Sequence, residues 1–235
     1  MKPWELLGET LAPDGTRLTL TRHDREYVIM ANGKSLMSSR MHGSEQALAT
    51  LGLAGADLGG GSVLVGGLGM GFTLRAALDL LPADAAVVVA ELVPAVVDWN
   101  TGPLGALAGH PLRDPRVTIT IGDVGGLLHS ATAAFDAALL DVDNGPDAFT
   151  ASGNAGLYDD RGLAAARDAL KPDGVLAIWS AWEDRRFEQR LRYAGFTVSV
   201  ERVRGRLAKG GPKHTLFLAR KHGDGNHGGW RRGDL

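Results

Sequence analysis

The sequence predicts an α/β protein with a doubly wound, mostly parallel seven-stranded sheet, antiparallel C-terminal strands and a small N-terminal β-hairpin region. Short apolar runs alternate with stretches of helical spacing through most of the chain, which is typical of a parallel sheet covered on both faces. The last two apolar runs are joined by a link too short for a helical crossover, so they should pair antiparallel. Near the N-terminus, two alternating runs meet at Asn32-Gly33, which indicates a tight hairpin.

Residues 1–58 form the first predicted unit, a small β region followed by a helix. The helix is expected over 44–55, "SEQALATLGLAG", where apolar residues recur at helical spacing. Ser44 is its predicted N-cap, because a serine hydroxyl can accept a hydrogen bond from a first-turn N–H group. Residues 16–21 are a predicted strand of this unit, and residues 26–39 are the alternating segment that contains the predicted hairpin turn at Asn32-Gly33.

Residues 59–220 form the second predicted unit, the main α/β domain, and 221–235 are polar and glycine-rich, which predicts a disordered tail. The expected strands are 63–66, 86–91, 116–121, 135–141, 173–179, 196–203 and 214–219. The expected helices are 72–81, 93–100 and 162–171, with 185–192 read as a solvated helix face.

The bulk composition is that of an ordinary soluble protein, with 44% hydrophobic and 22% charged residues. A net charge of −2 gives no sign of a nucleic-acid or membrane partner. The absence of cysteine excludes disulfides and thiol catalysis, and the histidines lack metal-ligand spacing, so no metal is expected. Neither a signal peptide nor a membrane span is evident, and we expect a cytoplasmic protein.

The segment 63–75, "VLVGGLGMGFTLR", has the form of a strand, a glycine turn and a helix. Such a turn brings bare backbone close to a nucleotide beside a helix N-terminus. Gly67, Gly69 and Gly71 form a G-x-G-x-G pattern, and Phe72 stands where a dinucleotide motif has its third glycine. No Gly-Lys-Ser/Thr follows, which excludes a P-loop. The tighter spacing resembles the first motif of S-adenosylmethionine-dependent methyltransferases and their relatives.

Two acidic residues are expected beside this turn, because the carboxyl ends of parallel strands meet at one edge of the sheet. Glu91 ends the second strand of the main domain, where a carboxylate can accept both ribose hydroxyl protons. Asp123 follows the third strand and can bond an adenine amino group, with Val124 next to it in the same predicted site. Asp123 is also a candidate N-cap for a helix over 124–130, and the two roles do not exclude each other.

Several further segments carry a resemblance to a known family. They are "GGLGMG" (66–71), "AEL" (90–92), "DPRVTITIGD" (114–123), "DAALLDVDNGP" (136–146) and "LYDDRGLAAARDALKPDGVLA" (157–177). With these segments the chain resembles a divergent member of the spermidine synthase (polyamine aminopropyltransferase) family, within the superfamily that has the S-adenosylmethionine-dependent methyltransferase fold. The resemblance runs from about residue 26 to residue 219 and implies a class I methyltransferase-like sheet.

The resemblance implies alkyl transfer from S-adenosylmethionine or its decarboxylated form, with no metal. Family members join decarboxylated S-adenosylmethionine to an amine, for which alignment of the reactants and a carboxylate base suffice. The first Asp of the family's D-x-x-D motif, its base, falls on Asp141. Asp143 lies one position short of the second acid and is the other catalytic candidate.

The amine half of the site departs from the family pattern. Gly69 replaces the acid that faces the aminopropyl ammonium, and Trp179 replaces a glutamine. Glu45 is the one candidate for the acid of the family's first helix. A desolvated ammonium needs partners, so we expect a rebuilt acceptor site, with Glu45, His42 and Trp179 as its candidate residues. Arg40, His42 and Glu45 could grip a carboxylate-bearing substrate, or belong to a solvated loop.

Three functions therefore stay open at this level. The first is transfer of an aminopropyl group to a small amine acceptor, and the second is methyl transfer on the same framework. The third is a nucleotide-binding module without turnover, against which the retained Asp141 and Asp143 argue. No nucleic-acid or membrane partner is expected, and the resemblance implies a homodimer.

Overall fold

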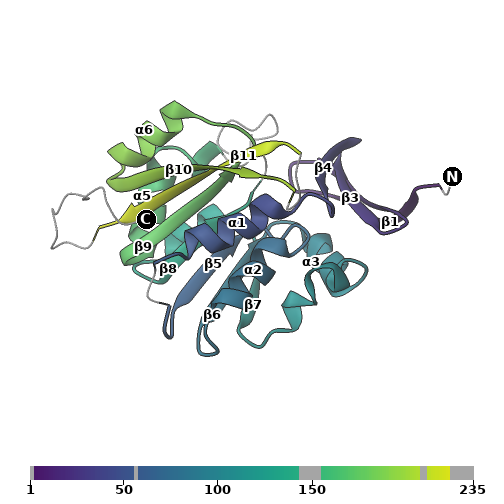
Figure 1. Ribbon diagram of the computed structural model, residues 1–235, viewed down its shortest axis with the longest axis horizontal. Coiled ribbons are helices and arrows are strands. Elements are labelled where there is room, and N and C mark those ends of the chain that lie inside the picture. The colour runs from purple at the N-terminus through teal and green to yellow at the C-terminus, as the bar shows by residue number, and fades with distance from the viewer. Residues whose placement is uncertain (1–2, 56–57, 143–154, 207–210, 223–235) are drawn as a thin grey trace.

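The computed structural model describes residues 3–55, 58–142, 155–206 and 211–222. It contains two sheets, a four-stranded sheet in the order β1-β2-β3-β4 and a seven-stranded sheet in the order β10-β11-β9-β8-β5-β6-β7. In Figure 1 the smaller sheet projects from one end of the larger α/β body. The predicted fold class is confirmed.

The seven-stranded sheet is parallel except at one strand. Strands β5 to β9 pair parallel with their neighbours, whereas β11 pairs antiparallel with both β9 and β10. This confirms the prediction drawn from the short link between the last two strands. The strands are β5 (Ser62–Gly66), β6 (Ala86–Glu91), β7 (Val117–Ile121), β8 (Phe135–Leu140), β9 (Leu170–Ser180), β10 (Phe196–Arg204) and β11 (Lys213–Lys221).

Both faces of this sheet are covered by helices, because side chains along each strand alternate between two apolar layers. Val63 and Val65 belong to the layer under α1, α2 and α3, whereas Leu64 belongs to the layer under α4, α5 and α6. The helices are α1 (Gly43–Gly52), α2 (Phe72–Leu80), α3 (Pro94–Thr101), α4 (Val124–Ser130), α5 (Asp160–Ala169) and α6 (Arg185–Tyr193). Short 3-10 turns are η1 (Gly105–Ala108), η2 (Pro111–Arg113) and η3 (Ala155–Leu157).

The N-terminal sheet is an antiparallel meander. Asn32 and Gly33 both have positive φ, +48° and +79°, as their hairpin turn requires. The first strand was not predicted, because its burial does not alternate. A Cβ atom on Gly8 would lie 2.4 Å from Trp99 Nε1, so this glycine lets β1 approach α3. The strands are β1 (Glu5–Leu11), β2 (Arg17–His23), β3 (Glu26–Ala31) and β4 (Lys34–Ser38).

Two sequence predictions about segment ends were wrong. The N-cap of α1 is His42 rather than Ser44, because Ser44 lies inside the first turn with its hydroxyl directed to other side chains. Strand β11 runs to Lys221, one residue into the segment predicted as a disordered tail, because this residue still pairs with Phe196. Residues 223–235 lie outside the described residues.

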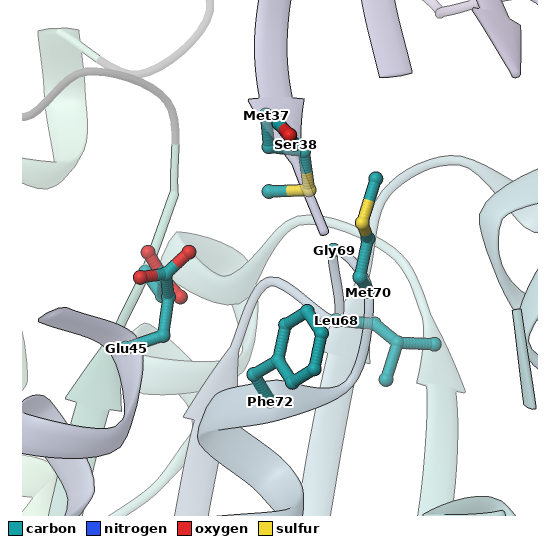
Figure 2. A pocket seen from close by; sticks show the side chains of 8 residues that line it. Met37, Ser38, Glu45, Leu68, Gly69, Met70 and Phe72 are labelled. Atoms are coloured by element: carbon teal, nitrogen blue, oxygen red, sulfur yellow. The ribbon is translucent and has the colours of Figure 1, made fainter. Parts of the chain in front are cut away.

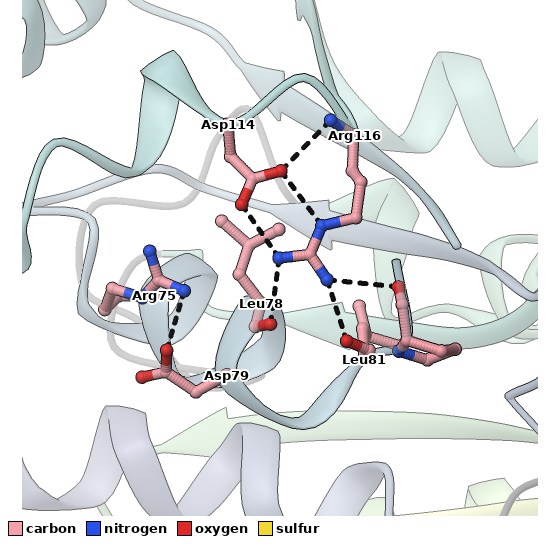
Figure 3. A network of polar contacts seen from close by, with 7 residues as sticks. Arg75, Leu78, Asp79, Leu81, Asp114 and Arg116 are labelled. Atoms are coloured by element: carbon pink, nitrogen blue, oxygen red, sulfur yellow. Dashed lines mark hydrogen bonds and ion pairs between the residues drawn. The ribbon is translucent and has the colours of Figure 1, made fainter. Parts of the chain in front are cut away.

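The "DPR" part of the segment 114–123 has a structural role (Figure 3). The Arg116 guanidinium binds the Asp114 carboxylate and donates to the carbonyl oxygens of Leu78, Leu81 and Pro82 at the end of α2. These bonds satisfy carbonyls that a helix leaves unpaired at its C-terminus. The hydrogen bonds from the Arg116 guanidinium to Asp114 lower the pKa of this carboxyl to about 2. Through both sets of bonds, Arg116 joins the end of α2 to the start of β7.

The described helices include none that is both long and apolar enough to cross a membrane. The longest α-helices, α1 and α5, have 10 residues each.

Candidate active site

The glycine turn joins β5 to α2 at the carboxyl edge of the large sheet. Gly67, Gly69 and Gly71 all have positive φ, +87°, +51° and +81°, and Gly71 is the N-cap of α2. A Cβ atom on Gly67 would lie 2.4 Å from the carbonyl oxygen of Asp141. The turn therefore requires glycine both for its backbone conformation and for its approach to the end of β8.

A small cavity lies over this turn, at the point where four elements meet (Figure 2). Its volume is about 10 Å³, which is room for about one water molecule. Met37 at the end of β4 fills the space above Gly69, where an added Cβ atom would lie 2.8 Å from the methionine Cε. The structure is therefore closed over the glycine turn by a methionine side chain.

Glu91 ends β6 and is 7% exposed. Its Oε2 accepts a hydrogen bond from the N–H of Leu68 in the glycine turn at 2.9 Å, and its Oε1 accepts one from the N–H of Val93 at 2.8 Å. Burial raises the pKa of this carboxyl, and these backbone N–H groups oppose the rise. Glu91 thus ties the glycine turn to the start of α3.

Asp123 and Val124 lie further along the same edge and do not line the cavity over the turn. Asp123 is exposed and caps α4, accepting from the N–H groups of Gly125 and Gly126 at 3.1 and 3.2 Å. Val124 is buried behind the turn, where a Cβ atom on Gly66 would lie 2.9 Å from its Cγ2. The structure thus shows the helix-capping role predicted for Asp123, and its role toward adenine remains a prediction.

Two carboxyl groups face the cavity, Asp141 immediately after β8 and Glu45 in the first turn of α1. The Thr73 hydroxyl donates to Asp141 Oδ2 at 2.8 Å. Burial raises the pKa of Asp141 to about 6, and burial together with the Asp141 charge raises the pKa of Glu45 to about 8. Because two adjacent buried carboxyl groups do not readily both ionise, the pair is expected to share one proton near neutral pH.

A hydrogen-bonded chain extends from Glu45 to the C-terminal strands. The Ser44 hydroxyl donates to Glu45 Oε2 at 2.7 Å, and His214 Nδ1 lies 2.8 Å from the same hydroxyl oxygen. Because the Ser44 proton is directed to Glu45, Nδ1 of His214 is the donor. The His214 ring packs against Trp179, with ring centroids 4.7 Å apart, and burial lowers the pKa of His214. Trp179 therefore contacts His214 and does not line the cavity that the two acids face.

Sequence reasoning missed three polar residues that organise this site, Thr73, Asn100 and His214. The Asn100 side-chain amide donates to the carbonyl oxygens of Gly69 and Val96, at 2.8 and 2.9 Å, and so fixes the glycine turn on α3. The signal for Thr73 was its place in the first turn of the helix after the glycines. Asn100 and His214 come from segments distant in sequence, and no motif marks them.

The remaining candidates lie apart from the cavity or outside the described residues. His42 stacks on Phe72, with ring centroids 4.2 Å apart, and lines a different cavity. Arg40 is exposed and pairs with Glu26 at 3.1 Å. Asp143 lies outside the described residues. Within the part of the chain that the structure describes, no three His, Cys, Asp or Glu residues cluster as metal ligands.

The strand order and the glycine turn define a protein of the methyltransferase-like, Rossmann-related class. The sequence model of the spermine/spermidine synthase domain matches residues 44–190, more than half of the chain. The chain therefore belongs to the spermine/spermidine synthase family, whose members are aminopropyltransferases that act on amines.

Two solved structures are similar in fold. One is a spermidine synthase in complex with the transition state analogue AdoDATO, and the other is the spermidine synthase from Thermotoga maritima. Each is 18% identical in sequence with a TM-score of 0.72, and the match covers 92% of this chain and 72% of the other. The comparison with curated proteins gives no match. At this identity the two structures support the fold.

Proposed function

We propose that this protein transfers an aminopropyl group from decarboxylated S-adenosylmethionine to the nitrogen of a small amine. The observation that carries the proposal is the buried Asp141 carboxyl group beside the glycine turn, which accepts a hydrogen bond from the Thr73 hydroxyl at 2.8 Å. Decarboxylated S-adenosylmethionine supplies a sulfonium group, from which the propyl carbon passes to the amine while the sulfur leaves as a thioether. Family membership supports the same reaction.

Asp141 is the proposed general base. A small amine is protonated at neutral pH, so one proton of its ammonium group passes to the Asp141 carboxylate and frees the nitrogen lone pair. That lone pair then forms the bond to the propyl carbon, and the carbon–sulfur bond breaks with its electrons going to the sulfur. A pKa of about 6 keeps this carboxylate ionised at neutral pH and still basic enough to take a proton. Glu45, protonated at neutral pH, is proposed to hydrogen-bond the acceptor, and Asp143 remains a predicted second catalytic acid.

The proposed donor site follows the carboxyl edge from the glycine turn to Asp123. Glu91 is proposed to accept hydrogen bonds from the ribose hydroxyls there. Leu92 and Ile121 are 43% and 51% exposed beside it, an apolar surface suited to an adenine ring. The glycines 67, 69 and 71 and Val124 complete the proposed site, with Asp123 at its far end.

Donor binding on this edge requires Met37 to leave the space over Gly69. A methionine suits this movement because its unbranched side chain has three rotatable bonds. His42 and Trp179 are proposed to support the acceptor end indirectly, through Phe72 and His214 respectively. The homodimer and the cytoplasmic location remain predictions.

One observation favours methyl transfer as the second candidate. Gly69 stands where family members have the acid that faces the donor's ammonium. In this chain the Met37 side chain lies over that position instead. Without that acid, the preference for a donor lacking the carboxylate is reduced.

Isothermal titration with S-adenosylmethionine, its decarboxylated form and methylthioadenosine separates these candidates. We expect the decarboxylated donor to bind more tightly than S-adenosylmethionine, and mass spectrometry of a mixture of amines to show an aminopropyl product. Tighter binding of S-adenosylmethionine with a methylated product would establish the methyltransferase. Binding without product from any amine would support a nucleotide-binding module, and no binding at all would refute every donor assignment made above.

A further inference from the structure

A second and much larger cavity is also bounded by Phe72. Its volume is about 520 Å³, within the range of small-molecule binding sites. It lies between the turn before β3, the end of β4, the first turns of α1 and α2, and η1. The lining residues that matter below are Arg25, Arg40, His42, Phe72, Arg75 and Leu107.

The charge of this lining is of one sign. Three arginines and a histidine face the cavity, and no acidic side chain is among the described residues that line it. The chain as a whole carries a net charge of −2, so this is a local concentration of positive charge. Such a concentration in a concave site raises the local population of anions.

The arginines are only partly neutralised by ion pairs. Arg40 pairs with Glu26 at 3.1 Å, and Arg75 pairs with Asp79 at 2.6 Å across one helical turn of α2 (Figure 3). Arg25 makes no ion pair with any described residue. The Nε atom of Arg75 is buried with no hydrogen-bond partner among the described residues.

Part of the remaining lining is apolar and flat, although Ser39 and Gln46 also contribute polar groups. The rings of His42 and Phe72 stack at 4.2 Å with their planes 16° apart, and Leu107 of η1 adds an aliphatic wall. His42 Nδ1 lies 3.0 Å from the carbonyl oxygen of Ser39, so this nitrogen donates and the ring orientation is fixed. An organic anion fits such a lining better than a bare inorganic ion, because its carbon skeleton finds apolar contacts.

We propose that this cavity is a binding site for a small organic anion, whose carboxylate or phosphate group is held by Arg25, Arg40 and Arg75. Guanidinium groups bind both kinds of anion through paired N–H donors. The site goes beyond the proposed function, because neither decarboxylated S-adenosylmethionine nor a simple amine acceptor carries a carboxylate or phosphate group. It adjoins the transfer site through Phe72, which lines both cavities.

The test is titration of the full chain with benzoate, phenyl phosphate and neutral benzyl alcohol, at constant ionic strength and without donor. Benzoate and phenyl phosphate distinguish a carboxylate site from a phosphate site. Arg25→Gln and Arg75→Gln are expected to weaken the better anion at least tenfold. Arg192→Gln is the matched control, since Arg192 forms the same kind of helical ion pair, with Glu188 at 2.8 Å on α6.

Saturable binding of one anion, lost in both cavity variants and kept in the control, would support the site. Three results would overturn it: no saturable binding of either anion, equal binding of benzyl alcohol, or equal weakening by Arg192→Gln. Arg25 is exposed and without an ion pair among the described residues, so its variant decides the matter even if Arg75→Gln fails to fold. No donor is present, so the outcome does not depend on whether the chain is an aminopropyltransferase.

Discussion

The two cavities that meet at Phe72 are opposite in size and in charge. The cavity over the glycine turn has about 10 Å³ and two carboxyl groups, whereas the other has about 520 Å³ and three arginines. The first turn of α1 supplies both, with Glu45 facing one and Gln46 the other. Consecutive helical residues point about 100° apart, so one turn of helix can contribute to both cavities.

The charged side chains of the two cavities differ in how far they are buried. The two acids are crowded and desolvated, which raises the pKa of both and leaves one proton between them. The arginines keep their charge and face open space, where they can meet an anion. The three predictions below test the acid side of this contrast, from the largest expected effect to the smallest.

Replacing the proposed base should have the largest effect. Asp141→Asn is expected to lower kcat of the aminopropyl transfer by about 10²- to 10⁴-fold, the usual contribution of a general base. Steady-state kinetics with decarboxylated S-adenosylmethionine would measure it. Asp168→Asn, at an exposed position on α5, is the control and should leave kcat unchanged. An unaltered kcat in Asp141→Asn would remove Asp141 as the base.

Glu45 should make the folded state less stable as pH rises. Its pKa is about 8 when folded against 4.5 ordinarily, so between these values the unfolded chain loses a proton that the folded chain keeps. Glu45→Gln is therefore expected to gain stability over the wild type across this window, by about 4 kcal/mol at its upper end. Urea unfolding at several pH values measures the gain, and Glu201→Gln, exposed on β10, is the control. A pH-independent difference would contradict the raised pKa.

Thr73→Val should produce the smallest change, a shift in pH dependence. The Thr73 hydroxyl stabilises the ionised form of Asp141, so its loss raises the pKa of Asp141 above about 6. The acid limb of kcat/KM is expected to move to higher pH by about one unit. Thr101→Val is the control, because it removes an exposed hydroxyl that donates to the backbone carbonyl oxygen of Asp98 and should leave the pH profile unchanged. A profile shifted equally by both variants would mean that Thr73 does not act on the base.

The large sheet was predictable because its signals are local. Apolar strands, helical spacing and the glycine turn each lie within about ten residues, and they located all seven strands and the antiparallel last pair. Strand β1 was missed because its side chains do not alternate in burial, and Ser44 was misassigned because any serine before a helix resembles a cap.

The site was predictable in part. The sequence predicted that Glu91, Asp141 and the glycines lie at one edge of the sheet, because the carboxyl ends of parallel strands meet there. It did not anticipate that Glu91 would bind the backbone of the turn, that Met37 would cover Gly69, or that His214 would reach Ser44. These contacts join segments up to 170 residues apart, and no local pattern specifies them.

By itself, the sequence determined the fold class, the nucleotide-type turn and the acids near it, since each depends on neighbours along the chain. Only the tertiary structure decided that the two acids are buried side by side, how closed the donor space is, and that three arginines from separate elements line one cavity. The reason is that burial and electrostatic proximity are properties of packed surfaces, which form when distant segments meet.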